Sequence, residues 1–99
     1  MIKNISVKNM TTKRLYISAD IEGVAGVVSG EHMTPAGFEY RQAREWFTAE
    51  VASACEAAFN HGIDEVVVSD SHGNGQSLLL DKLPDQVEVV RSWPRPLCM

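Results

Sequence analysis

Two carboxylates stand near the end of a predicted strand, at a spacing that suits a cation. Apolar and polar residues alternate from Leu15 to Gly23, and Asp20 and Glu22 fall on the same polar face, since strand side chains have a period of two. If the strand stays extended, the carboxylates lie roughly 6 to 7 Å apart. At an effective dielectric of about 20, their repulsion costs on the order of 2 to 3 kcal/mol. A divalent metal between them would turn this cost into an attraction.

A histidine follows the next predicted strand and completes a possible ligand set. His72 comes three residues after the segment 64–69, which contains a β-branched run. In open parallel sheets the carboxyl ends of the strands form the crevice where ligands bind. If the two strands are close neighbours, His72 therefore converges with Asp20 and Glu22. One imidazole and two carboxylates form a reasonable set for Zn²⁺.

The residues around His72 have structural alternatives that the sequence leaves open. Asp70 or Ser71 could form a hydrogen bond with the ring nitrogen of His72 that does not bind the metal, and so orient the ring. An acid at a strand end is also a common turn former. Gly73 and Gly75 could cradle a phosphate on their backbone amides, or could serve only to permit a tight turn. A histidine in a loop is itself more often a surface residue than a ligand.

Three other chemistry-bearing side chains are expected to be structural. His61 lies at a predicted helix end, where an imidazolium complements the helix dipole. His32 lies in a loop with no evident partner and is predicted to be a surface residue. Cys55 lies on an apolar helical stripe and is predicted to be a buried, inert thiol.

The elements that position these residues are predicted to alternate between strands and helices. Residues 1–12 are expected to form a flexible tail, and Thr34 before Pro35 could mark a helix start. The order β-α-β-α-β predicts an α/β fold of the three-layer type with a parallel sheet and right-handed crossovers. The expected strands span residues 14–20, 64–69 and 87–91, and the expected helices span residues 38–60 and 76–83.

Length and charge restrict the function classes. A chain of 99 residues with a net charge of −4 makes one small domain with no electrostatic footprint for nucleic acid or an anionic membrane. No apolar run approaches the ~18 residues that span a bilayer, and the first residues do not read as a secretory signal. Two cysteines, Cys55 and Cys98, suggest reduced thiols and a cytoplasmic protein.

Three segments together resemble the D-aminopeptidases, cytoplasmic zinc metallopeptidases of the dipeptide-transport-operon type. The resemblance is carried by Ser18–Gly23, Glu65–Gly73 and Pro94–Leu97, and it covers residues 15–99. It implies a dinuclear zinc site in which Asp20 bridges both ions, Glu22 holds one and His72 the other. It also implies hydrolysis of N-terminal residues from short peptides that contain D-amino acids, and a homo-oligomeric ring that encloses the active sites.

The resemblance also implies ligands and a catalytic histidine beyond Met99, because members of the family are longer. Residues 13–99 are therefore expected to be the N-terminal part of a single metallopeptidase domain, with an incomplete sheet and with the rest supplied by further sequence or by a companion chain. Two alternatives stay open. One is an Mg²⁺-dependent phosphohydrolase of the aspartate-phosphatase type, and the other is a non-catalytic α/β assembly fragment.

Overall fold

The computed structural model of the chain describes residues 11–95. Most of the predicted tail, residues 1–12, lies outside the described residues, and so does Cys98. The elements, in chain order, are β1 (Arg14–Ala19), the 3₁₀ turn η1 (Gly30–His32), α2 (Tyr40–Asn60), β2 (Glu65–Asp70), the 3₁₀ turn η2 (Leu80–Lys82) and β3 (Glu88–Val90).

The three strands form a parallel sheet in the order β1-β2-β3. The predicted α/β class is confirmed, and each strand begins and ends within one residue of its expected bounds. The β1–β2 register places Leu15 opposite Val66 and Ala19 opposite Asp70. The two strands therefore end level with each other, and the segments that follow them start from the same edge of the sheet.

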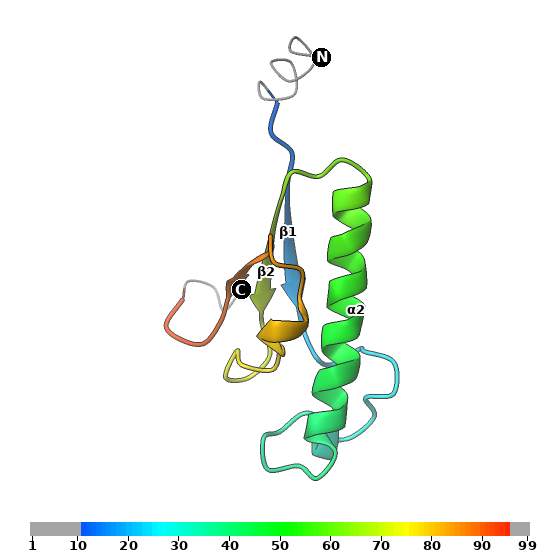
Figure 1. The fold of residues 1–99 in the computed structure, drawn as a ribbon. Helices are drawn as coiled ribbons and strands as arrows, with labels where there is room; N and C mark the ends of the chain where they lie inside the picture. The colour runs from blue at the N-terminus through cyan, green and yellow to red at the C-terminus, as the bar shows by residue number, and fades with distance from the viewer. Residues whose placement is uncertain (1–10, 96–99) are drawn as a thin grey trace.

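Helix α2 lies along one face of the sheet (Figure 1) and contributes Ala43, Phe47, Val51 and Cys55 to the core. Its apolar stripe follows the predicted helical spacing, and Phe47 is 1% exposed. Ile17 and Ala19 of β1 line the same cavity as Phe47 and Val51 of α2, so this face of β1 packs towards the helix. None of the described helices is long and apolar enough to cross a membrane.

The helix expected over residues 76–83 is wrong, because only the 3₁₀ turn η2 forms there. The backbone donors that a helix would use are bound elsewhere. The Leu78 N–H donates to Asp70 Oδ2 at 2.7 Å, and the Leu79 N–H donates to Thr48 Oγ1 at 3.0 Å. These two bonds hold the segment in an extended path against β2 and α2.

The expected helix start at Thr34 and Pro35 is also wrong, because α2 begins at Tyr40. The Thr34 hydroxyl donates to the Gly30 carbonyl at 3.0 Å, so this side chain closes η1 instead of capping a helix. The Gly37 N–H donates to the Thr34 carbonyl at 2.8 Å. The chain thus makes a further turn before α2 starts.

Candidate metal centre

The sheet register brings Asp20 and His72 together. The pairing of β1 with β2 continues for one bond past the strands, because the Ser71 N–H donates to the Ala19 carbonyl at 2.8 Å. Asp20 directly follows Ala19 and His72 directly follows Ser71, the two residues that this last bond joins. Two residues far apart in the sequence thus become neighbours at the carboxyl edge of the sheet, as the sequence predicts.

Glu22 joins them through a turn rather than through an extended strand. Strand β1 ends at Ala19, so the chain does not stay extended through Glu22, which was the condition for the expected spacing of the two carboxylates. The Glu22 N–H donates to Asp20 Oδ1 at 3.2 Å, the turn-forming bond typical of an aspartate side chain. Gly23 follows with a φ of +97°, a conformation that a glycine adopts without strain.

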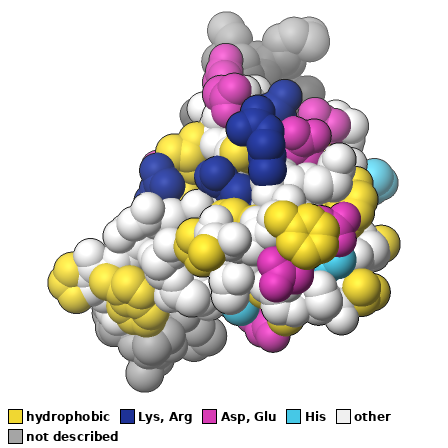
Figure 2. Space-filling view, turned by 90° about the horizontal axis from the view of Figure 1, so that it is seen from below, with side chains coloured by type: hydrophobic (Ala, Val, Ile, Leu, Met, Phe, Trp, Pro, Cys, Tyr) yellow, Lys and Arg dark blue, Asp and Glu magenta, His cyan; other side chains and the backbone are white. Residues whose placement is uncertain are grey.

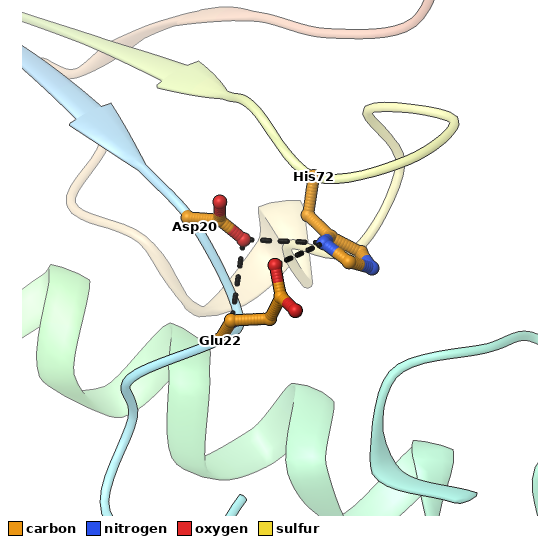
Figure 3. A group of neighbouring side chains, drawn as sticks. All are labelled: Asp20, Glu22 and His72. Carbon is orange, nitrogen blue, oxygen red and sulfur yellow. Dashed lines mark hydrogen bonds and ion pairs between the residues drawn. The ribbon is translucent and has the colours of Figure 1, made fainter. Parts of the chain in front are cut away.

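The three side chains point towards one another (Figure 3). His72 Nδ1 lies 3.2 Å from Asp20 Oδ1 and 3.4 Å from Glu22 Oε1. One ligand atom from each residue lies within 4.8 Å of the other two. Figure 2, which views the molecule from the carboxyl ends of β1 and β2, shows acidic and histidine side chains side by side on this surface.

The donor set and its spacing fit a zinc ion. Zinc binds carboxylate oxygen and imidazole nitrogen at about 2.0 to 2.2 Å, so two ligands of a tetrahedral site lie roughly 3.3 to 3.6 Å apart. The two measured separations from His72 Nδ1, 3.2 and 3.4 Å, are close to that range. Two carboxylates also neutralise the charge of a divalent cation, and the side chains of Asp20 and Glu22 are 48% and 56% exposed. The ligand atoms are therefore open to solvent.

The second ring nitrogen of His72 has a partner that the sequence analysis did not identify. His72 Nε2 lies 3.1 Å from the carbonyl oxygen of Met33. The prediction that Asp70 or Ser71 holds the ring is wrong. The Asp70 carboxylate is engaged with Leu78, and Ser71 Oγ lies 2.9 Å from Ser18 Oγ.

Asp70 instead holds the segment that follows the His72 loop. It is fully buried, and burial raises the pKa of its carboxyl group, opposed by the N–H groups of Leu78 and Ser77 and by the charges of Arg91 and Arg95. Its Oδ1 has no hydrogen-bond partner within the described part of the chain. The Arg95 guanidinium donates to its backbone carbonyl. Asp70 therefore joins the end of β2 to two later segments.

The glycine-rich loop is a turn and not a phosphate cradle. Gly73 and Gly75 have φ values of +55° and +69°, and the Gly75 N–H donates to the His72 carbonyl at 2.8 Å. The Trp93 indole N–H donates to the Gly73 carbonyl at 3.0 Å. Since an amide that a phosphate would need is used within the loop, the structure does not favour the phosphohydrolase alternative.

His32 is buried, and the prediction of a surface residue is wrong. It is 4% exposed, with Nδ1 3.1 Å from Ser29 Oγ and Nε2 3.3 Å from Glu39 Oε2. Its ring lies 6.0 Å from the ring of Trp46. The sequence offered two signals for a buried His32, the hydroxyl of Ser29 and the carboxylate of Glu39. By contrast, the partner of His72 is the backbone carbonyl of Met33, which no pattern of side chains indicates.

Of the other two structural predictions, Cys55 is confirmed as buried, and burial raises its pKa. His61 follows the last residue of α2, and its Nδ1 lies 2.8 Å from the Ala57 carbonyl oxygen. Both side chains lie away from the Asp20, Glu22 and His72 group.

Comparison with known proteins bears on the chemistry of this group. The model of the D-aminopeptidase family matches residues 13–99. A D-aminopeptidase of Bacillus subtilis (strain 168) is 30% identical over 86 residues, which are 87% of this chain and 31% of the relative. The solved structure of the Zn-dependent D-aminopeptidase DppA from Bacillus subtilis, described as a self-compartmentalizing protease, matches with a TM-score of 0.84 at 30% identity. The match covers 87% of this chain and 31% of that structure's chain. This chain therefore spans about a third of the length of these relatives.

Proposed function

This chain belongs to the D-aminopeptidase family, and from that membership we propose that it carries zinc ligands of a peptide hydrolase. The proposed ligands are Asp20, Glu22 and His72. The reaction we propose for the complete protein is removal of the N-terminal residue from short peptides that contain D-amino acids. The observation that carries the proposal is the convergence of these three donors, within 4.8 Å of one another, at the carboxyl edge of the sheet.

Each side chain has a definite part in this proposal. Asp20 and Glu22 supply the two negative charges that make a divalent cation favourable in an exposed position. His72 supplies a nitrogen donor, which selects for zinc over the harder magnesium ion. Bound there, zinc would supply Lewis acidity, lowering the pKa of water and polarising a peptide carbonyl. In the two-ion arrangement that the family resemblance implies, these three ligands are shared between the ions, and further donors complete each site.

The family resemblance implies a second zinc ion, with Asp20 as the bridging ligand. Asp20 suits that role because a carboxylate offers two oxygens, of which Oδ1 faces His72. A catalytic zinc usually has three protein ligands of its own, so a second ion needs donors in addition to these three side chains. Among residues 11–95, these are the three side chains that form such a group.

The assembly and location of the complete protein are further parts of the proposal. The matched relative from Bacillus subtilis is described as self-compartmentalizing, and we extend this to a homo-oligomer that encloses the site. A cytoplasmic location is supported by the free, buried thiol of Cys55, since reduced cysteines are typical of that compartment.

Zinc titration of the metal-free chain tests the ligand assignment. We expect a stoichiometric site whose affinity falls by at least about tenfold in Asp20→Asn, Glu22→Gln and His72→Gln. Matched exchanges at exposed positions, Asp81→Asn and Glu56→Gln, should leave the affinity unchanged. A wild-type chain that binds zinc no better than the three ligand variants would refute the proposal, and would favour the assembly-fragment alternative.

A further inference from the structure

The two ring nitrogens of His72 have different surroundings, and this decides which of them can bind a metal. Nδ1 faces the carboxylates of Asp20 and Glu22, whereas Nε2 lies 3.1 Å from the Met33 carbonyl oxygen. A carbonyl oxygen only accepts hydrogen bonds, so this contact needs an N–H on Nε2. A neutral imidazole carries one N–H, and Nδ1 is then left with the lone pair that a metal needs.

The position of the Met33 carbonyl is set by η1, the turn that precedes it. The Met33 N–H donates to the Gly30 carbonyl at 3.0 Å, and the His32 N–H donates to the Ser29 carbonyl at 3.0 Å. The Thr34 hydroxyl donates to the same Gly30 carbonyl. The bond from the Met33 N–H holds the peptide before Met33, and the bond from the Thr34 hydroxyl holds the residue after it, so together they restrict the direction of the Met33 carbonyl that meets His72.

His32 holds η1 against α2. Its Nδ1 lies 3.1 Å from Ser29 Oγ and 3.4 Å from the Val28 backbone nitrogen, both just before the turn. Its Nε2 lies 3.3 Å from Glu39 Oε2, directly before the first residue of α2. The ring thus joins the start of η1 to the start of the helix. As the ring is 4% exposed and lies beside Trp46, truncating it would also leave a cavity.

We propose that His32 is a positioning residue for the candidate metal centre. By holding η1 in place, it keeps the Met33 carbonyl against His72 Nε2, and so presents Nδ1 of His72 as the metal-binding nitrogen. The inference rests on the proposed function, because it assumes that His72 is a ligand. It adds a second histidine to the site, one that contacts no metal and acts through a backbone carbonyl.

The nitrogen through which His72 binds zinc is the first test. Nitrogen-15 NMR of the imidazole rings in the zinc-loaded chain distinguishes zinc on Nδ1, with an Nε2–H, from zinc on Nε2, with an Nδ1–H. The signals of His72 are assigned by their loss in His72→Gln. We expect the Nε2–H form for His72. A predominant Nδ1–H form would overturn the proposal.

The second test compares His32→Ala with His61→Ala. His61 is exposed and follows the far end of α2, so it provides the same substitution away from η1. With folding checked by circular dichroism, we expect His32→Ala to give a mixture of zinc bound through Nδ1 and through Nε2 of His72, and zinc affinity weaker by about tenfold or more. We expect His61→Ala to change neither. A folded His32→Ala chain that binds zinc through Nδ1 of His72 alone, with wild-type affinity, would overturn the proposal.

Two provisions keep the outcome decisive. If His32→Ala does not fold, Glu39→Gln weakens the same link by removing the charge that faces Nε2, and the same two measurements apply. If the wild-type chain binds no zinc, the proposed function fails. If the chain binds zinc through Nε2 of His72, the proposed function stands and only this inference is overturned.

Discussion

A methyl group at Gly37 has no room, because the backbone of η1 passes directly over this position. A Cβ built there would lie 2.1 Å from the Glu31 carbonyl oxygen and 2.7 Å from its carbonyl carbon. To reach the shortest separations that real Cβ atoms show, about 3.0 Å, the two segments must move apart by roughly 1 Å. The obstacle is backbone and not a flexible side chain, so the strain cannot be relieved by a rotamer change.

The cost of Gly37→Ala can be estimated from these contacts. Overpacking of this kind costs about 1 to 3 kcal/mol, and we take the upper end because backbone must move. Replacing glycine also lowers the entropy of the unfolded chain, which offsets about 0.4 to 1 kcal/mol. The expected net loss is therefore about 2 kcal/mol. With a urea m-value near 1 kcal/mol/M, typical of a small protein, the unfolding midpoint falls by roughly 2 M.

Urea unfolding followed by circular dichroism measures this loss, with Gly30→Ala as the matched control. Gly30 also lies in this segment, but a Cβ there meets nothing within 4 Å, and neither glycine has a positive φ. We expect Gly30→Ala to be neutral or slightly stabilising. Equal midpoints for the two variants would refute the close approach of Gly37 to Glu31.

Three further predictions concern the core and its hydrogen bonds. Phe47→Ala, at a position 1% exposed, should lower the free energy of unfolding by about 3 to 5 kcal/mol in the same urea assay. Thr48→Val should lower the free energy of unfolding by about 1 to 3 kcal/mol, because it leaves the Leu79 N–H without its acceptor. Thr48→Ser keeps the hydroxyl and should lose less. Faster hydrogen exchange of the Leu79 amide in Thr48→Val would locate the effect. Burial raises the pKa of Cys55 above its ordinary 9.0, so the unfolded chain ionises first and stability should fall as pH rises above about 9. Urea midpoints of wild type and Cys55→Ala from pH 7 to 10 check this, since the variant should lack that part of the decrease.

The convergence of the candidate ligands was predictable because it depends on patterns that the sequence displays. The alternation before Asp20 marks a half-buried strand and the β-branched run before His72 marks a buried one, and parallel pairing brings their carboxyl ends together. The same reasoning could not foresee the turn that joins Asp20 to Glu22. That depends on the bond from the Glu22 N–H to the Asp20 side chain, which bends the chain.

The failures have a common physical cause. The segment around Leu78 looks helical from its own residues, but its amides are bound by side chains of Asp70 and Thr48, which lie on other elements. The residues around His32 have the composition of a surface loop, yet its ring is buried beside the ring of Trp46. The amides of Leu78 and Leu79 bind side chains distant in the sequence, and His32 is covered by Trp46 of another element; local propensity carries no record of such contacts.

The parallel pairing of β1 with β2 makes the candidate centre sensitive to strand slippage that core burial alone would tolerate. A slip of two residues returns every side chain to its original face, so the apolar contacts with α2 could largely re-form. Yet it would carry Asp20 roughly 7 Å along the sheet relative to His72, farther than any single ion can span. Substitutions that loosen the Ala19–Asp70 alignment should therefore impair metal capture well before they unfold the chain.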